Sequence, residues 1–348
     1  MPRRGGNSVG ASNLGLGTNQ EHARTIMQML RNGAAARSEI VASWDRCVRL
    51  HKLNPERDGS QFVASQMELR EAVDHVEAYL QAADLELESI ARQMGKLSFF
   101  VSFANADGLA LSHRGCVPDL GRSNLKVTDG MCWHERSEGT NAIGTALYMK
   151  RPIVIYRDEH FYYSNSLMTC LATPLFGPTG SLVGALNATT IDQRADRSLA
   201  SVLLALLIAA AQRMEAAWFR NAHPKCLVVP IPEATCASGS TALLAVDVDL
   251  NVLGATHGAR THCRIEREAL EAGVQLDQIG EGIRLPEPSL VDSERGAIKR
   301  ALALSGQKVS AAANRLGISR TTMHRKMVAY NLRRKPQRRT TTAPSAQA

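Results

Sequence analysis

Two glycines, Gly306 and Gly317, divide the C-terminal part of the sequence into three short segments whose apolar residues recur at helical spacing. A glycine that follows a helix commonly adopts the left-handed conformation that ends it. The middle segment contains three consecutive alanines, which allow close packing, and Ser319 is well placed to cap the last segment. We therefore expect an all-α helix-turn-helix over residues 289–332, with helices at 291–304, 309–316 and 320–330.

The positive charge of the chain is concentrated at this same end. The whole sequence has a formal net charge of +8. From Ser289 onward there are 13 lysines and arginines and two acids, a net charge of +11. The preceding 288 residues have 28 basic and 31 acidic residues, a net charge of −3. A basic domain of this kind is typical of proteins that bind a polyanion, so double-stranded DNA is the expected partner.

The outward side of the last helix holds the residues that we expect to contact DNA. In a helix-turn-helix the first residues of the second helix meet base edges in the major groove, so the base-contacting candidates are Ser319, Arg320 and Thr321. The phosphate-contacting candidates follow on the same helix and are Thr322, His324, Arg325 and Lys326. The alternative is an ordinary solvated helical face. An alanine-rich helix, a glycine turn and a capping serine together argue against it.

The stretch 310–327, SAAANRLGISRTTMHRKM, resembles the Fis-type helix-turn-helix that ends many bacterial enhancer-binding regulators. The resemblance implies that the helix at 291–304 helps to form a dimer. The basic tail at 333–348 has two interpretations, which are further contacts with phosphates or the minor groove and a plain disordered segment.

The rest of the chain combines short strands with long flanking helices, which indicates an α+β fold. Residues 1–20 are rich in glycine and are expected to be disordered, and 21–67 form a helical N-terminal region. A domain follows at 68–220, with β-hairpins at 97–113 and 169–189, a strand at 152–156 and helices at 68–94, 140–149 and 197–220. Prolines mark linkers at 221–241 and 276–288, and the segment 242–275 between them is expected to hold one more hairpin and a helix at 262–272.

The segment 139–147, GTNAIGTAL, resembles the signature of the GAF domain in acetoin-catabolism regulators. Supporting segments lie at matching places, SWDRC at 43–47, EHF at 159–161 and TCLATP at 169–174. Residues 243–259 resemble the short PAS-like part that follows in that family. The resemblance implies a GAF-like sensor domain over 68–220 and a PAS-like connector over 242–275.

A GAF-like domain also implies a pocket for a small-molecule effector, and such pockets are mostly apolar with a few polar groups. The candidate ligand-binding residues are Thr140, Asn141, Thr145, His160, Tyr162, Tyr163 and Cys170. The alternative for each of them is a structural role; Asn141, for example, can simply cap the helix that follows it. His160 and Cys170 have no third ligand nearby in the sequence, so we expect no metal site and no cofactor.

The acetoin-catabolism regulators usually have a large ATPase between the sensor and the helix-turn-helix. Here only a short linker separates the two parts, and the sequence contains neither a G-x-x-x-x-G-K-[ST] phosphate loop nor the GAFTGA loop that engages sigma-54. We therefore expect a homodimeric transcriptional regulator that contacts RNA polymerase and acts without ATP hydrolysis. The alternative is an interaction module that pairs with a full-length, ATPase-bearing relative and modulates it. No arrangement of nucleophile, base and orienting group indicates an enzyme.

Seven cysteines without a C-x-x-C pair do not suggest a disulfide framework and fit buried intracellular thiols. The first residues lack the apolar core of a signal peptide. The longest apolar run, 199–211, is shorter than the ~20 residues that a bilayer requires. The sequence therefore predicts a cytoplasmic protein with no membrane contact.

Overall fold

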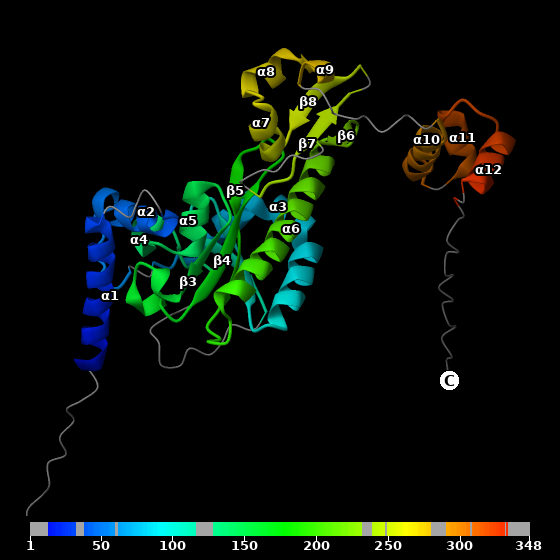
Figure 1. The fold of residues 1–348 in the computed structure, drawn as a ribbon. Coiled ribbons are helices and arrows are strands. Elements are labelled where there is room, and N and C mark those ends of the chain that lie inside the picture. Colours follow the sequence, from blue (N-terminus) through cyan, green and yellow to red (C-terminus); the bar gives the residue numbers. More distant parts are fainter. Residues whose placement is uncertain are drawn as a thin grey trace, which may run out of the picture. The chain divides into compact units, whose positions relative to one another are not determined.

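The computed structural model describes the chain in segments separated by gaps, at residues 13–32, 38–59, 62–115, 128–231, 239–247, 249–279, 290–306, 308–330 and 332. The chain divides into two units, residues 1–283 and residues 284–348, and each is described by itself (Figure 1).

The first unit is built on a five-stranded antiparallel sheet with the strand order β2-β1-β5-β4-β3. Its strands are β1 (Phe100–Asn105), β2 (Ala110–Arg114), β3 (Ile153–Tyr156), β4 (Thr169–Phe176) and β5 (Leu182–Thr190). The long helices α3 (Gln66–Gly95) and α6 (Arg197–Ala222) lie on one face, and the short helix α5 (Ala142–Met149) lies on the other (Figure 1). The predicted hairpins, strand and helices of this domain are confirmed.

Alternation along the strands gives the sheet its two cores, because successive side chains of a strand point to opposite faces. Val101, Phe103 and Leu186 are buried against α3 and α6. Ala104 and Ala185, their neighbours along the same strands, belong to the core beneath α5. The sheet is therefore covered on both sides.

The two long helices are fixed by a cap and by burial. Ser65 accepts a hydrogen bond from the Glu68 backbone N–H, and the Glu68 carboxylate accepts one from the Ser65 N–H, so a capping box starts α3. By length and composition alone α6 would be long and apolar enough to cross a membrane, which is weak evidence. In the structure Leu203 and Leu207 of α6 are buried in the core shared with α3, as expected of a core helix.

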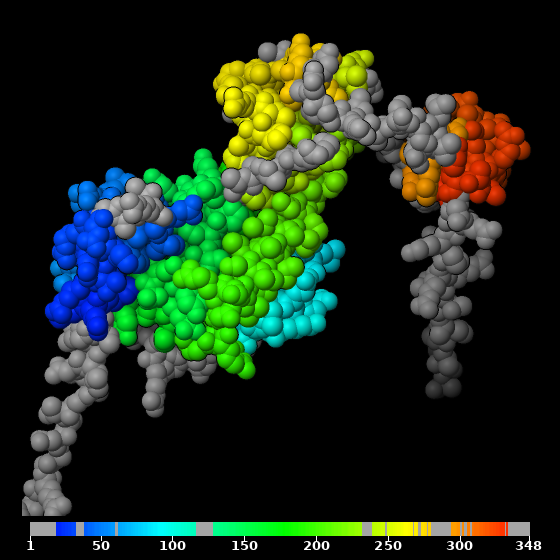
Figure 2. All heavy atoms as spheres, viewed as in Figure 1, coloured from blue at the N-terminus to red at the C-terminus, as the bar shows by residue number. Residues whose placement is uncertain are grey.

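Among the described residues before α3 there are three helical segments, namely α1 (Asn13–Arg31), α2 (Glu39–Asp45) and a π-helical turn (Arg46–Leu50). Because α1 begins at Asn13, the prediction of disorder is wrong for residues 13–20, and residues 1–12 lie outside the described residues. Ile26 of α1 and Trp44 of α2 pack with Phe161 in a core of their own. Figure 2 shows these helices, in blue, against the green part of the domain.

A second, smaller antiparallel sheet follows in the first unit, with the order β6-β7-β8-β9. Its elements are β6 (Leu227–Pro230), β7 (Leu243–Val246), β8 (Asn251–Ala255), α7 (His257–Cys263), α8 (Arg267–Ala272), β9 (Val274–Gln275) and α9 (Leu276–Ile279). Three predictions need correction. The strand β6 lies inside the predicted linker 221–241, and the helix α9 lies inside the predicted linker 276–288. In place of the single helix expected at 262–272 there are two helices, α7 and α8. Arg264, with φ +54°, ends the first of these.

The second unit holds three helices among its described residues, α10 (Leu290–Leu304), α11 (Val309–Arg315) and α12 (Arg320–Ala329). Gly306 and Gly317 have φ values of +57° and +63° in the two turns, as the sequence predicts. Ile298, Ala312 and Met323, one from each helix, form the centre of its core. The basic tail at 333–348 lies outside the described residues.

Candidate functional site

The exposed face of α12 is the candidate DNA interface. Arg320, Thr321, His324 and Arg325 are exposed on it. Ser319 caps the helix by accepting the Thr322 backbone N–H at 3.1 Å, and the two hydroxyls lie 2.8 Å apart. Thr322 is half-buried, whereas Ser319 is exposed like these four, so five of the seven predicted DNA-contacting residues are exposed.

Lys326 lies on a different side of α12 from these residues. Its ammonium forms an ion pair with Glu294 of α10, and the Tyr330 hydroxyl donates a hydrogen bond to the same carboxylate. These contacts lower the pKa of Glu294, the bond from Lys326 contributing most. Lys326 thus ties α12 to α10, a contact between helices about 30 residues apart in sequence that the helical pattern alone does not reveal.

Sequence reasoning missed an apolar residue on the exposed face of α12. Val328 is 73% exposed, two turns beyond Arg320 on α12. It borders a groove of about 680 Å³ between α11 and α12, together with Lys308 at the start of α11. The spacing of Val328 from Arg320 and His324, four residues at each step, would have placed it on their face.

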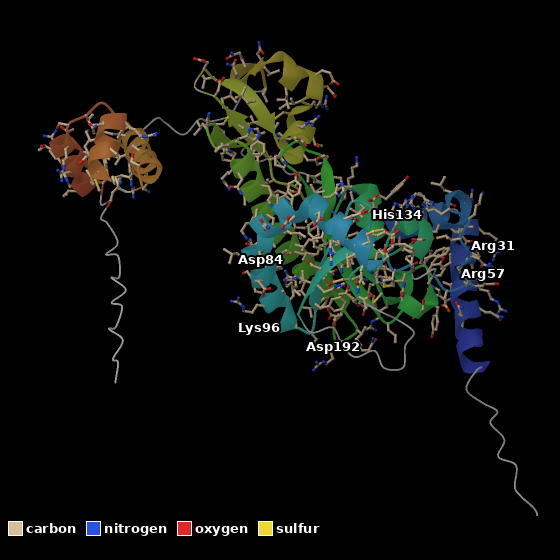
Figure 3. The ribbon with its side chains drawn as sticks, turned by 180° about the vertical axis from the view of Figure 1, so that it is seen from behind. Arg31, Arg57, Asp84, Lys96, His134 and Asp192 are labelled. Atoms are coloured by element: carbon tan, nitrogen blue, oxygen red, sulfur yellow. The ribbon has the colours of Figure 1, made fainter. Side chains whose placement is uncertain are left out.

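In the first unit two of the candidate ligand-binding residues belong to a buried polar network around Glu135. Glu135 begins α4 (Glu135–Glu138), whose first turn is capped by His134, labelled in Figure 3. The Glu135 carboxylate accepts hydrogen bonds from the Ser43 hydroxyl at 2.7 Å and from the Thr145 hydroxyl at 3.0 Å. Thr140 lies 2.7 Å from the Ser43 hydroxyl.

Arg46 completes this network, because its Nε and Nη2 atoms donate to the two Glu135 oxygens at 2.8 and 2.9 Å. The guanidinium also lies 3.9 Å from the centre of the Tyr148 ring. The network joins α2 and the π-helical turn to α4 and α5. Thr140 and Thr145 therefore serve the packing of the N-terminal helices in this structure. Neither residue lines the small cavity beneath α5, which lies between that helix and the sheet.

His160 and Tyr162 are buried at the contact with α1 and α2. The His160 carbonyl lies 2.9 Å from Nε2 of His22, and the ring Nδ1 lies 2.8 Å from the Arg157 carbonyl. Burial lowers the pKa of His160 to about 4, so its ring is neutral at pH 7. Burial likewise raises the pKa of Tyr162 to about 12. Tyr163, 37% exposed, stands beside the His22 ring. These three residues are thus also away from the cavity.

The cavity itself lies between α5 and the sheet and has a volume of about 20 Å³, the space of about one water molecule. Two of the candidate ligand-binding residues, Asn141 and Cys170, line it. Burial raises the pKa of Cys170 to about 12, which keeps the thiol protonated. Its other lining residues come from β1, β2, β5, the start of α5 and the surrounding loops: Phe100, Ser102, His113, Trp133, Ala142, Ile143, Met168, Asn187 and Thr189.

Three polar residues on the sheet floor were missed by sequence reasoning. The Asn187 amide donates to Ser102 at 3.1 Å and to Thr189 at 3.0 Å, and the Thr189 hydroxyl donates to the Cys170 sulfur at 3.3 Å. Asn187 and Thr189 are two residues apart on β5, so both face α5. Polar residues at alternate positions of an otherwise apolar strand were the signal that could have found them.

Among the residues that the structure describes, no group of three or more His, Cys, Asp or Glu side chains could hold a metal ion.

Two protein-family models match the sequence of this chain. Residues 18–215 match the family model of the MimR N-terminal domain, and residues 289–330 match that of the bacterial regulatory protein, Fis family. The first match covers more than half of the chain and includes the N-terminal helices, the Glu135 network and the cavity. The chain belongs to the MimR N-terminal domain family.

Relatives of this MimR-family chain have names that agree with the predicted resemblance. The acetoin catabolism regulatory protein of Cupriavidus necator is 26% identical over 69% of this chain and 38% of its own length. The acetoin dehydrogenase operon transcriptional activator AcoR of Bacillus subtilis is 28% identical, with coverages of 57% and 33%. The propane 2-monooxygenase operon transcriptional activator MimR of Mycolicibacterium smegmatis is 28% identical, with coverages of 51% and 30%. The MimR-family chain spans about a third of the length of these curated relatives.

Among solved structures, the E. coli DhaR(N)–DhaL complex aligns with 76% of the MimR-family chain and 86% of its own, at 19% identity and a TM-score of 0.47.

Proposed function

We propose that this protein is a sequence-specific DNA-binding transcriptional regulator that acts without ATP hydrolysis and is not an enzyme. The observation that carries the proposal is the exposed basic face of α12 in a unit that matches the Fis family. Arg320, Thr321, His324 and Arg325 lie on it, where a helix-turn-helix meets the major groove. The matching relatives are named as operon activators and regulators, which supports the same role.

The five-stranded domain is the GAF-like sensor in this proposal, and the second sheet is the PAS-like connector. A small cavity with an apolar wall and a polar floor supports a small-molecule effector. Lys, Arg, Asp and Glu are absent from its described lining, and His113 is paired with Asp129, so the effector is a small, uncharged molecule that forms hydrogen bonds. A cavity of about 20 Å³ must enlarge to admit it, and this enlargement is the conformational signal.

The regulator acts as a homodimer in the cytoplasm, with a contact to RNA polymerase and no membrane. Val202 and Leu206 of α6 are 63% and 43% exposed and support a dimer contact on that helix. Leu203, Leu207 and Ala210 of the same helix are buried in the core of the chain itself. The proposed dimer contact on α6 is therefore confined to its exposed side.

A second candidate function is a partner that forms mixed dimers with a full-length relative and modulates it. Relatives that share the MimR N-terminal region but are about twice as long favour it. Capture of a tagged chain from cells separates the two functions. Recovery of a full-length, ATPase-bearing relative at equal amounts indicates mixed dimers, and recovery of the tagged chain with a second copy of itself indicates the homodimer.

Mapping of bound DNA in cells, with the wild type and Arg320→Ala compared, tests the main proposal. We expect discrete peaks that share a two-fold symmetric site for the wild type and loss of these peaks for the variant. Arg220→Ala, an exposed arginine on α6, is the matched control and should keep them. Uniform binding without peaks, or phosphate release from ATP above a mock preparation, would contradict the proposal.

A further inference from the structure

A second pocket lies apart from the cavity beneath α5, between the turn that joins β4 to β5 and the second sheet. It has a volume of about 690 Å³, within the ~300–1,000 Å³ range of small-molecule sites. Thr179 and Gly180 of the turn form one wall, and Gly254 of β8 and Arg260 of α7 form the other. His223, at the end of α6, also lines it. The predicted ligand-binding residues do not contribute to it.

The described lining of this cleft contains two nitrogen-bearing side chains that can carry positive charge, Arg260 and His223, and no carboxylate. Arg260 donates from Nη1 to the Thr179 carbonyl at 2.9 Å and from Nε to the Ile265 carbonyl at 3.5 Å. A guanidinium has five N–H donors, so these two bonds hold its plane in place and leave donors for a ligand. Burial lowers the pKa of His223, which makes its ring a neutral donor at pH 7.

Two glycines make room for these side chains. A Cβ atom on Gly254 would lie 2.5 Å from Nε2 of His223, closer than any real contact allows. A Cβ atom on Gly180, whose φ is +77°, would lie 3.2 Å from Nη1 of Arg260. The backbone is thus shaped on both walls so that the two nitrogen-bearing groups can reach the cleft.

We propose that this cleft binds a small anion that bears a carboxylate or a phosphate, with Arg260 as the cationic donor and His223 and the Thr179 hydroxyl as neutral donors. The walls belong to the two sheets of the first unit, so a bound anion would bridge the sensor-like sheet and the second sheet. The site therefore senses a different chemistry from the cavity beneath α5, whose lining fits an uncharged molecule.

Titration calorimetry on the full chain tests the proposal with inorganic phosphate, citrate and, as an uncharged probe, glycerol. Leu253→Glu places a negative charge on the cleft wall at a residue that is 53% exposed, so the variant should fold. Leu227→Glu, 45% exposed on β6 and outside the cleft, is the charge-matched control. We expect Leu253→Glu to weaken the binding of one of the two anions at least about tenfold and the control to change it less than about twofold.

The basic C-terminal unit also attracts anions, but it does so equally in both variants, so the difference between them reports the cleft alone. A difference confined to phosphate identifies a phosphate-bearing ligand, and one confined to citrate identifies a carboxylate. Equal affinities of the wild type and Leu253→Glu for both anions would overturn the proposal. DNA binding measured on the same samples distinguishes this outcome from a failure of the proposed regulatory function.

Discussion

Arg320 and Arg325 occupy different turns of α12 and both are exposed. Arg320, the first residue of the helix, is placed to bind a base edge, so Arg320→Ala should cost about 1–3 kcal/mol at one base pair and relax the preference there. Arg325→Ala should weaken all sequences alike and reduce the salt slope by about 1, because a phosphate contact is lost. Fluorescence anisotropy on matched and mismatched duplexes at several salt concentrations measures both. Uniform losses in both variants would show that the assigned roles are wrong.

Lys326 lends itself to a separate test, because its ammonium already pairs with Glu294. If that contact is its main role, Lys326→Ala should lower the thermal midpoint of the C-terminal unit and leave the salt slope of DNA binding unchanged. Glu294→Gln removes the other partner and should lower the same midpoint, and Arg325→Ala is the matched control for loss of one positive charge. A reduced salt slope without loss of stability would instead support the phosphate contact that the sequence predicts for Lys326.

Glu215 is a buried carboxylate that joins the two sheets of the first unit. It accepts hydrogen bonds from the Phe176 N–H at 2.9 Å, the Ser240 hydroxyl at 2.6 Å and the Thr241 N–H at 3.1 Å. Burial raises its pKa to about 7, although these three bonds oppose the rise. A raised pKa means that the folded state binds the proton more tightly than the unfolded state does.

The stability that Glu215 contributes is therefore present below its ordinary pKa of 4.5 and is lost as the pH rises through about 7. Glu215→Gln should remove this dependence, and the difference in unfolding free energy between variant and wild type should change by up to about 3 kcal/mol over that range. Urea unfolding at several pH values measures it. His223 and His257, whose pKa values burial lowers, titrate in both proteins, so the difference isolates Glu215. Parallel curves for the two proteins would contradict the prediction.

At this scale the sequence predicts local contacts well and distant ones poorly. Ser319 caps α12 as expected, because a cap depends on residues only a few positions away. Asn141 caps α5, the local role that the sequence offered as the alternative, and it also lines the cavity, while its role in ligand binding stays a prediction. Thr140 and Thr145 were placed in the pocket, but their partner Ser43 lies almost a hundred residues earlier. Nothing in the local spacing predicts that approach.

Helix α5 depends on one side chain at its start. The Asn141 amide oxygen accepts the Gly144 N–H at 2.9 Å, while its nitrogen donates to the carbonyls of Trp133 and Gly139, each at 2.9 Å. Asn141→Ala removes the cap and leaves buried carbonyls without a donor, so it should lower the unfolding free energy by about 2–3 kcal/mol. Asn54→Ala, in an exposed turn, is the control and should cost less than about 1 kcal/mol. Equal effects in urea unfolding would contradict the role of Asn141.

Element prediction succeeded where periodicity was strong. The capped, amphipathic α3 and the apolar α6 were found to within two residues of their bounds. The strand β6 was missed because its residues stand among prolines, and Pro230 is its last residue. It exists because it pairs with β7, which begins more than ten residues later in the sequence. Such pairing is decided by tertiary structure and not by local pattern.

At the scale of the whole molecule, we predict that two chains associate into a dimer. Light scattering at micromolar concentration should give twice the mass of one chain. Val202→Glu with Leu206→Glu, both exposed on α6, should halve that mass and weaken binding to a symmetric DNA site far more than to random DNA. Leu97→Glu, 42% exposed and outside α6, is the control. A wild-type monomer would remove the basis for paired half-sites.

The helix α6 runs without interruption for 26 residues, a rod about 39 Å long. From Ala200 to Trp218 it packs in the core that it shares with α3 and the five-stranded sheet, and its last turn places Phe219 in the small core of the second sheet with Leu243 and Ala245. One rigid element therefore belongs to both cores. A tilt of the whole helix by about 5° moves one end relative to the other by about 3 Å, more than half the rise of one helical turn. The two sheets are thus mechanically coupled, because α6 cannot shift in the first core without carrying Phe219 along in the second.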